Sequence, residues 1–407
     1  MSQKKFIDLF AGCGGLSLGL VKSGWNGVFA IEKSEDAFKT FHTNFCQEHS
    51  KLHFKWPSWL PLRAMTTQQL LTQFPKQLND LKGKIDMITG GPPCQGFSLA
   101  GLRNPNDPRN ELIQDYIAVV RIVQPKLVLL ENVNGINMKF PHQDSPYSIK
   151  IQNLLKSCSD HGYRVHSSML NASAFGVPQM RSRYVMIAIR GDMPKLFNNP
   201  FDSLSDALPR FLKVRGLTGA ETMVRDAISD LEINDRKLKS SVDTPGFFQI
   251  PYDEKHSLST YQQLMRQDVG KNFEPNSLRL ANHRKETQSR FQRILHECPK
   301  GVCMSKEDRK KFGLKKQSLT PLHPEKLAGT VTTIPDDMIH YHEPRVLTVR
   351  ENARLQSFPD WFNFEGKYTT GGHRRRHECP RYTQVGNAVP PLMAEAIGET
   401  LLHLLAS

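Results

Sequence analysis

Long hydrophobic runs are missing from this sequence of 407 residues. No apolar stretch approaches the roughly 18 residues of a membrane-spanning helix, and the residues after Met1 show no signal-peptide core. The seven cysteines are odd in number and lack the spacing of a disulfide framework. These absences argue against a membrane protein and a disulfide-stabilised secreted protein, so we expect a cytoplasmic chain with free thiols.

Metal-binding patterns and repeats are also poorly represented. Cys298 and Cys303 have the wrong spacing for a usual zinc knuckle, and His373, His377 and Cys379 form only a loose cluster. The chain contains no internal repeat and no long low-complexity tract. We therefore expect no metal site and no repeat architecture.

Composition and charge place the chain among folded, basic proteins. Hydrophobic residues make up 38% and charged residues 23%, close to globular averages. At about 150 residues per domain, the length predicts two or three lobes. The net charge of +14 favours a polyanionic partner such as nucleic acid, although a soluble protein without such a partner can be equally basic.

The first motif is a glycine turn between a predicted strand, Phe6–Phe10, and a predicted helix that begins at Leu16. Strand, glycine turn and helix open a dinucleotide-type βαβ unit, in which the backbone approaches a ligand and the helix amino terminus favours an anion. The next predicted strand, Gly27–Ile31, ends at Glu32, a position suited to ribose hydroxyls. The turn lacks the full nicotinamide fingerprint and is not a P-loop, so a purely structural turn stays open.

A second motif presents a cysteine at the end of a strand. The predicted buried strand Ile85–Ile88 leads into Gly90–Ser98, where glycines and prolines end regular structure and expose Cys94. The stretch Leu99–Asn110 is predicted to be a long loop that can act as a lid. Taken alone, Cys94 is also compatible with a small buried hydrophobic residue.

Polar residues accompany two further predicted strands. Glu131 follows the apolar run Lys126–Leu130, although an acid there can simply cap the next turn. Alternation puts Gln179, Arg181 and Arg183 on one face of an extended segment, where they suit recognition of carbonyl or phosphate oxygens. A solvated strand edge is the alternative for these three.

The second half of the chain changes character. From residue 191 to about 318 the alternation of strands and helices is lost, which predicts a second lobe. The basic run Arg309–Lys316 includes a phenylalanine and suits contacts with backbone phosphates, or is a solvated charge run. Thr348 and Glu351 form a capping-box pattern at a helix start, and a last helix is predicted from Leu392 to Leu405.

In this order and spacing, six segments resemble the cytosine-5 DNA methyltransferase family of bacterial restriction-modification type. They span Phe6 to Pro391 and are DLFAGCGG, GGPPCQGFS, ENV, QMRSR, RVLTVRENARLQSFP and QVGNAVPP. The resemblance implies an α/β fold, with a Rossmann-like S-adenosylmethionine-dependent methyltransferase sheet and a second, smaller target-recognition domain. It implies a catalytic domain of 1–190 plus 378–407 and a DNA-binding domain of 191–377, with DNA in the cleft between them.

The resemblance also implies catalytic roles. Cys94 corresponds to the nucleophile that adds to carbon 6 of cytosine, and Glu131 to the acid that binds ring nitrogen 3 and the exocyclic amine. Arg183 corresponds to the residue that holds the base carbonyl, with Arg181 and Gln179 nearby. Because a free thiol is mostly protonated at neutral pH, Cys94 needs neighbouring positive charge.

For the cofactor, S-adenosyl-L-methionine, the resemblance implies a pocket with Glu32 on the ribose. The family's acid that contacts the adenine amine has no convincing match before Leu81. The other pocket residues are expected to be Phe10, Gly12, Gly14, Gly15, Leu16, Pro93, Leu112 and Asn387.

The implied partner is double-stranded DNA, and the target base must leave the stack to be reached. We expect a monomer, associated with the nucleoid and without a membrane partner, and a functional pairing with a restriction endonuclease stays open. Two alternatives stay open: an RNA cytosine-5 methyltransferase of the same fold, and a catalytically inactive DNA-binding regulator.

Overall fold

The computed structural model describes residues 3–93, 111–139, 145–194, 199–217, 221–252, 257–270, 273–371, 374 and 378–406. The chain divides into two compact units. Unit 1 comprises residues 1–171, 182–209 and 393–407, and unit 2 comprises residues 172–181 and 210–392. Within the described ranges, no helix is both long and apolar enough to cross a membrane.

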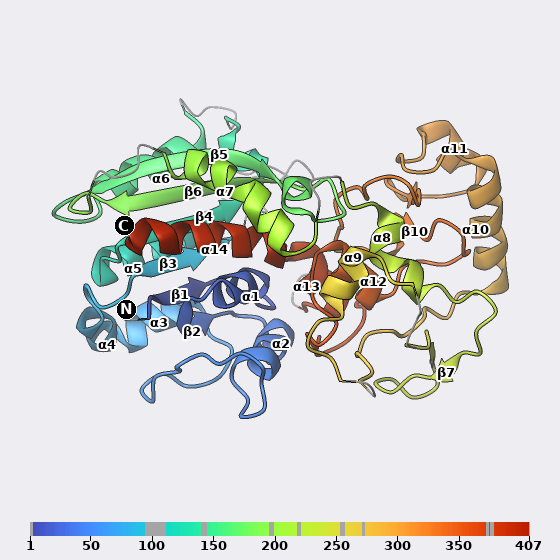
Figure 1. Ribbon diagram of the computed structural model, residues 1–407, viewed down its shortest axis with the longest axis horizontal. Coiled ribbons are helices and arrows are strands. Elements are labelled where there is room, and N and C mark those ends of the chain that lie inside the picture. The colour runs from blue at the N-terminus through green and yellow to red at the C-terminus, as the bar shows by residue number, and fades with distance from the viewer. Residues whose placement is uncertain are drawn as a thin grey trace. The chain divides into compact units, whose positions relative to one another are not determined.

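A six-stranded sheet forms the centre of unit 1, in the order β2-β1-β3-β4-β6-β5 (Figure 1). The neighbours from β2 to β4 pair in parallel, whereas β6 runs antiparallel to both β4 and β5. This α/β sheet confirms the predicted fold class. Its strands are β1 (Lys5–Leu9), β2 (Asn26–Ile31), β3 (Met87–Gly90), β4 (Leu127–Asn132), β5 (Tyr163–Asn171) and β6 (Ser182–Arg190).

Strand order creates a switch point beside β1. The chain passes from β1 to β2 on one side and then returns to place β3 on the other. Connections therefore leave β1 and β3 in opposite directions, which opens a crevice at the carboxyl ends of these strands. The glycine turn after β1 and the Gly90–Pro93 segment after β3 both start at this edge.

Side-chain alternation along the strands builds the core of unit 1. Ile7, Ile88 and Val128 come from adjacent strands and belong to one buried cluster with Tyr116. The Tyr116 hydroxyl lies 3.2 Å from the carbonyl oxygens of both Ile88 and Leu129, so its polar end is satisfied inside the core. The helices of unit 1 include α1 (Gly15–Lys22), α2 (Glu35–Phe45), α3 (Thr67–Gln73), α4 (Pro75–Asp80), α5 (Glu111–Val123) and α6 (Tyr147–Lys156).

The last helix, α14 (Pro391–Ala406), packs against the start of the chain (Figure 1). The Trp25 indole Nε1 donates a hydrogen bond to the Gly398 carbonyl oxygen at 2.9 Å, and Trp25 is 1% exposed. Lys22 and Glu395 form an ion pair at 3.6 Å. Residues 373 positions apart in sequence therefore close unit 1.

Short elements joined by long connections make up unit 2, which contains buried ion pairs. Arg354 is fully buried, and its guanidinium pairs with Asp360 at 2.6 Å and with Asp230 at 3.2 Å. The elements are α8 (Val224–Ile228), β7 (Lys239–Ser240), β8 (Phe248–Gln249), α9 (Thr260–Met265), α10 (Lys285–Glu297), α11 (Lys306–Lys311), β9 (Thr320–Pro321), β10 (Met338–Ile339), α12 (Val349–Leu355) and α13 (Arg381–Asn387). A longer helix, α7 (Pro200–Val214), contains the division between the units.

The predicted capping box at Thr348 is confirmed. The Thr348 hydroxyl accepts from the Glu351 backbone N–H at 3.1 Å, and the Glu351 carboxylate accepts from the Thr348 N–H at 2.6 Å. The same carboxylate forms two 2.8 Å hydrogen bonds with Arg345. One buried acid therefore caps α12 and neutralises a buried arginine.

The compact units divide the chain at positions other than 190 and 377. Residues 172–181 belong to unit 2, because Gln179 and Arg181 make hydrogen bonds there. Residues 378–392 also belong to unit 2, where Arg381 bonds to Ser277 at 3.0 Å. The domain functions assigned to the two parts stay predictions.

Close packing between α14 and α1 predicts the effect of Gly398→Ala. A Cβ at Gly398 would lie 2.2 Å from the Ser23 hydroxyl and 3.1 Å from Leu20 Cδ2. Alanine normally favours a helix by about 1 kcal/mol, but overpacking here should lower the free energy of unfolding by about 1–3 kcal/mol. Gly329→Ala is the control, since among the described residues its Cβ meets only Met338, at 3.9 Å. Urea unfolding that shows G398A to be as stable as wild type would contradict the packing argument.

Candidate active site

The backbone after β1 adopts a left-handed conformation three times within five residues. Phe10, Gly12 and Gly14 have φ angles of 61°, 57° and 96°. Glycine adopts this region without penalty, but a phenylalanine there is strained. Such strain is concentrated at binding and catalytic positions, where the surrounding structure maintains it.

Two glycines of this loop meet different surroundings. A Cβ on Gly14 would lie 2.5 Å from the Phe45 ring and 3.0 Å from Phe41, so internal packing excludes a side chain. A Cβ on Gly12 would meet no described atom within 4 Å. The backbone at Gly12 therefore borders open space that a ligand can approach closely.

Glu32 joins the end of β2 to the glycine loop. Its Oε2 accepts from the Gly12 backbone N–H at 3.0 Å, and its Oε1 accepts from the Ser34 N–H at 2.7 Å. Burial raises the pKa of the Glu32 carboxyl, and these backbone donors oppose that shift. Each oxygen keeps acceptor capacity, so the carboxylate can receive further hydroxyl donors.

The N-cap position of α1 provides no side-chain hydrogen bond to the helix. Gly14 is the N-cap residue, the first turn contains no acid, and the first backbone N–H groups have no intrahelical partner. A carboxylate is stabilised at such an end by the N–H groups and the helix dipole. Glu32 and α1 together fit a ligand that carries both ribose hydroxyls and a carboxylate.

The segment after β3 leads to Cys94, which lies outside the described residues together with the predicted lid Leu99–Asn110. The Asn132 side-chain amide donates to the Pro92 carbonyl oxygen at 3.0 Å and holds the segment against the end of β4. A Cβ on Gly90 would lie 2.3 Å from the Leu9 carbonyl oxygen, so only glycine fits there. The four residues before Cys94 are thus fixed to the sheet edge.

Glu131 and Arg183 form an ion pair next to this segment. Arg183 Nε lies 2.8 Å from Glu131 Oε1, and the two side chains are 11% and 13% exposed. A Cβ on Gly91 would lie 3.2 Å from Glu131 Oε2, so the carboxylate borders the backbone that precedes Cys94. The antiparallel pairing of β4 with β6 brings together two residues that are distant in sequence.

Gln179 and Arg181 have different surroundings from Arg183. The Gln179 amide donates to the Leu355 carbonyl oxygen at 2.7 Å and accepts from the Val331 N–H at 3.0 Å. The Arg181 guanidinium donates to the carbonyl oxygens of Val331 at 3.0 Å and Gly386 at 2.7 Å. These buried side chains bind backbone of unit 2, whereas Arg183 belongs to unit 1. Alternation in sequence therefore did not produce equivalent environments.

The remaining predicted pocket residues occupy three places. Pro93 is half-buried at the end of the segment after β3, and Leu112 is half-buried at the start of α5. Asn387 is exposed and is the last residue of α13 in unit 2. Gly15 and Leu16 are buried and begin α1.

Sequence reasoning missed Asp8, which lies fully buried in β1. Its Oδ2 accepts from the Ser17 hydroxyl of α1 at 2.6 Å, and burial raises the pKa of Asp8 to about 7. Its Oδ1 and the hydroxyl of Thr89, its register partner on β3, have no hydrogen-bond partner among the described residues. The sequence signal that could have identified Asp8 is that it is the one acid within the apolar run Phe6–Phe10.

Taken together, the sheet and its edge define an α/β enzyme of the nucleoside-cofactor-binding class, with an acid and an arginine paired beside the segment that precedes Cys94. The chain matches the model of the C-5 cytosine-specific DNA methylases over residues 4–403. It belongs to this family and is an S-adenosylmethionine-dependent DNA (cytosine-5-)-methyltransferase, which confirms the predicted family and enzyme class.

Individual relatives agree with the family assignment. The type II methyltransferase M.DdeI of Desulfomicrobium norvegicum is 32% identical, over 97% of this chain and 88% of that protein. The type II methyltransferase M.XorII of Xanthomonas oryzae pv. oryzae is 31% identical, over 100% and 86%.

Solved structures show the same fold. A putative DNA modification methyltransferase encoded within an E. coli prophage superposes with a TM-score of 0.66 at 26% identity, covering 100% of both chains. The S. pombe Dnmt2 methyltransferase, at 17% identity and a TM-score of 0.55 over 99% of both chains, is similar in fold.

Titration of Asp8 predicts a pH-dependent effect of Asp8→Asn. The carboxyl ionises near pH 4 when unfolded but near pH 7 when folded, so its contribution to stability falls as the pH rises between these values. The asparagine side chain does not titrate. Relative to wild type, D8N should gain roughly 2–3 kcal/mol between about pH 5 and about pH 8. Urea unfolding at both pH values measures this gain, and an unchanged difference would argue against a protonated Asp8.

Proposed function

We propose that this enzyme transfers a methyl group from S-adenosyl-L-methionine to carbon 5 of a cytosine rotated out of duplex DNA, through a covalent Cys94 adduct. The observation that carries the proposal is the Glu131–Arg183 pair, which lies partly buried beside the segment that leads to Cys94. The open backbone at Gly12 and the Glu32 carboxylate belong to the same sheet edge.

The cofactor site is proposed at the glycine loop. Glu32 accepts the ribose hydroxyls, and the uncapped amino terminus of α1 receives the methionine carboxylate. When bound, S-adenosylmethionine supplies an electrophilic methyl group on a sulfonium. The other proposed pocket residues are Phe10, Gly12, Gly14, Gly15, Leu16, Pro93, Leu112 and Asn387.

Each catalytic residue has one task in this scheme. The Cys94 thiolate forms a bond to carbon 6 while Glu131 hydrogen-bonds ring nitrogen 3 and the exocyclic amine, which stabilises the charge that enters the ring. S-adenosylmethionine, when bound, would supply its methyl group to carbon 5 of the resulting enamine, with the methyl–sulfur bond broken and S-adenosylhomocysteine as the leaving group. Loss of the carbon 5 proton to a base or water, followed by elimination of the thiolate, restores the aromatic ring and the free enzyme.

Arg183 is suited to bind both the Glu131 carboxylate and the flipped cytosine. Its Nε is occupied by Glu131, and its Nη1 donates to the Ser182 carbonyl oxygen at 2.8 Å. Its Nη2 has no hydrogen-bond partner in the described part of the chain and is available for the cytosine carbonyl oxygen. The ion pair thus preorganises a donor for the flipped base.

Arg181 and Gln179 are better suited to positioning than to contact with the base. Their polar groups bond to backbone carbonyl and amide groups of unit 2. The chain passes from unit 2 to unit 1 between Arg181 and Ser182, two residues before Arg183. We propose that Arg181 and Gln179 anchor the start of β6, the strand that contains Arg183.

The biological setting is proposed from the relatives, which are type II methyltransferases. We infer a monomer that modifies a short duplex sequence and works alongside a restriction endonuclease. Unit 2 is proposed to contain the residues that read that sequence. Tritium transfer from labelled cofactor to duplex DNA, compared with transfer RNA, tests the substrate class, and incorporation into transfer RNA alone would favour an RNA methyltransferase.

Cys94→Ala should abolish methyl transfer and leave cofactor binding largely intact, because it removes the nucleophile and no proposed cofactor contact. Tritium incorporation into DNA measures the first effect and calorimetric titration with the cofactor measures the second. Cys303→Ala, at an exposed free cysteine, is the control and should retain full activity. Turnover of C94A near the wild-type rate would overturn the assignment.

Glu131→Gln keeps the shape of the side chain but removes its charge and its ion pair with Arg183. We expect kcat to fall by about 10²-fold or more, since a charged hydrogen bond to the transition state is lost. Cofactor affinity should not change. Glu325→Gln, which disrupts an exposed ion pair with Arg225, is the matched control. A kcat for E131Q close to that of E325Q would exclude this role for Glu131.

A further inference from the structure

Positive charge is concentrated in one segment of unit 2. Residues 284–316 contain eleven lysines and arginines against four acids, a net charge of +7 within a chain whose net charge is +14. This segment includes α10 and α11 and the connection between them. Half of the net charge of the chain therefore belongs to 33 consecutive residues.

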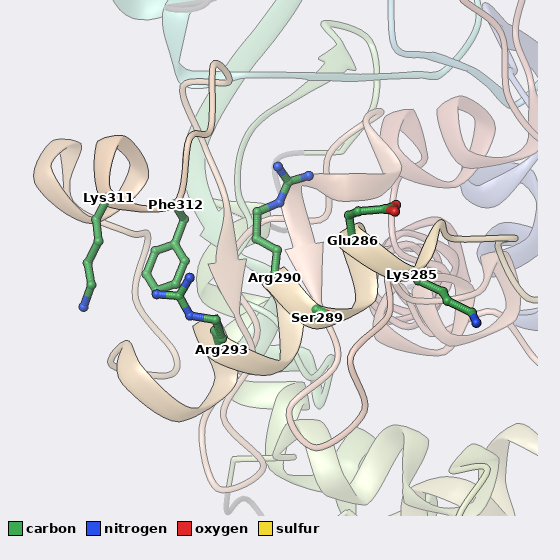
Figure 2. A pocket seen from close by; sticks show the side chains of 7 residues that line it. All are labelled: Lys285, Glu286, Ser289, Arg290, Arg293, Lys311 and Phe312. Carbon is green, nitrogen blue, oxygen red and sulfur yellow. The ribbon is translucent and has the colours of Figure 1, made fainter.

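One face of helix α10 is buried, and this packing fixes the position of its basic face. Its Phe291, Ile294 and Leu295 are buried and pack in a cluster with Phe312 and Leu319. The other face borders a groove of about 520 Å³ (Figure 2). The groove is lined by Lys285, Glu286, Ser289, Arg290, Arg293, Lys311 and Phe312.

Two of the four cations in this groove are already paired. Arg293 lies 3.0 Å from one Glu297 oxygen, and Lys311 lies 2.7 Å from the other. Both cations also lie over the Phe312 ring, at 5.1 Å and 5.4 Å from its centre. These contacts hold the end of the groove in place.

The other two cations have no such partner. Within the part of the chain that the structure describes, Lys285 and Arg290 make no ion pair, and the buried Arg290 Nε has no acceptor. Figure 2 shows both side chains extending away from Lys311 and Phe312. Unpaired positive charge on a rigid helix is therefore available for an anionic ligand.

The spacing of these cations favours a polymer over a small anion. Lys285 and Arg293 are eight residues apart on α10, which corresponds to about 12 Å along a helix. Over that length one DNA strand carries three to four phosphates, at about 3.4 Å of helix axis each. A single phosphate instead requires donors that converge on one point, and Figure 2 shows side chains distributed along the helix.

We propose that the groove on α10 and α11 binds the sugar-phosphate backbone of duplex DNA, independently of base sequence. The proposal rests on the proposed function, since DNA is the substrate, and adds a backbone contact to the reading of bases. Arginine, lysine and the Ser289 hydroxyl are the usual donors to phosphate oxygens. Such contacts raise affinity for every DNA sequence and make binding sensitive to salt.

The test compares the double variant Lys285→Ala/Arg290→Ala with Lys76→Ala/Lys82→Ala, which removes the same charge from exposed positions of unit 1. Fluorescence anisotropy with cognate and scrambled duplexes should show about tenfold weaker binding to both for the groove variant. The slope of log Kd against log salt should fall by about 2 relative to the control, because two phosphate contacts are lost. The methylated sequence and kcat at saturating DNA should be unchanged.

Binding and slope equal to those of the control would overturn the proposal, as would an altered methylated sequence. Lys285→Gln/Arg290→Gln replaces the first variant if its circular dichroism shows misfolding. Failure of the proposed function gives a different result: wild-type protein then transfers no methyl group to DNA, whereas the anisotropy comparison still reports on the groove.

Discussion

The position of β1 between β2 and β3 is the constraint on which the site depends. Parallel pairing on both sides places the carboxyl ends of three strands at one edge, and the chain leaves that edge in opposite directions. The glycine loop, Glu32 and the segment before Cys94 all begin there. Backbone geometry at Gly12 and Gly90 then allows close approach without side-chain obstruction. The proposed methyl-donor site and the segment that precedes the proposed nucleophile therefore belong to adjacent strands of one sheet.

The ion pair of the candidate site differs in exposure from the structural ion pairs of unit 2. Glu131 and Arg183 are paired but slightly exposed, and Arg183 Nη2 has no hydrogen-bond partner among the described residues, which suits a ligand. Arg354, Asp230 and Asp360 in unit 2 are buried and mutually neutralised, which suits a structural role. Removing one partner of such a buried pair leaves an uncompensated charge in the interior, which typically lowers the free energy of unfolding by about 3–5 kcal/mol. Basic residues in unit 2 therefore have two uses: some arginines neutralise buried acids, whereas Lys285 and Arg290 supply unpaired charge to the groove on α10.

Much of the sheet and its edge could be predicted from the sequence. Apolar runs bounded by glycine and proline located the strands, and Thr348 with Glu351 located the start of α12. The separate fates of Gln179, Arg181 and Arg183 could not be predicted, because alternation shows which way a side chain points and says nothing about what it meets. Asp8 was overlooked for the same reason: its neighbours Ser17 and Thr89 lie on other elements.

The sequence by itself determined the chemistry available to this protein: a cysteine loop, a glycine turn, an acid at the end of β2 and six ordered segments of a methyltransferase family. These features are local, since turns and strand ends depend on neighbouring residues. Tertiary structure alone decided that Glu131 pairs with Arg183, that Glu32 holds the Gly12 backbone, and that α14 closes onto Trp25. Those contacts join distant residues, and they arise from strand order and packing, which no local pattern specifies.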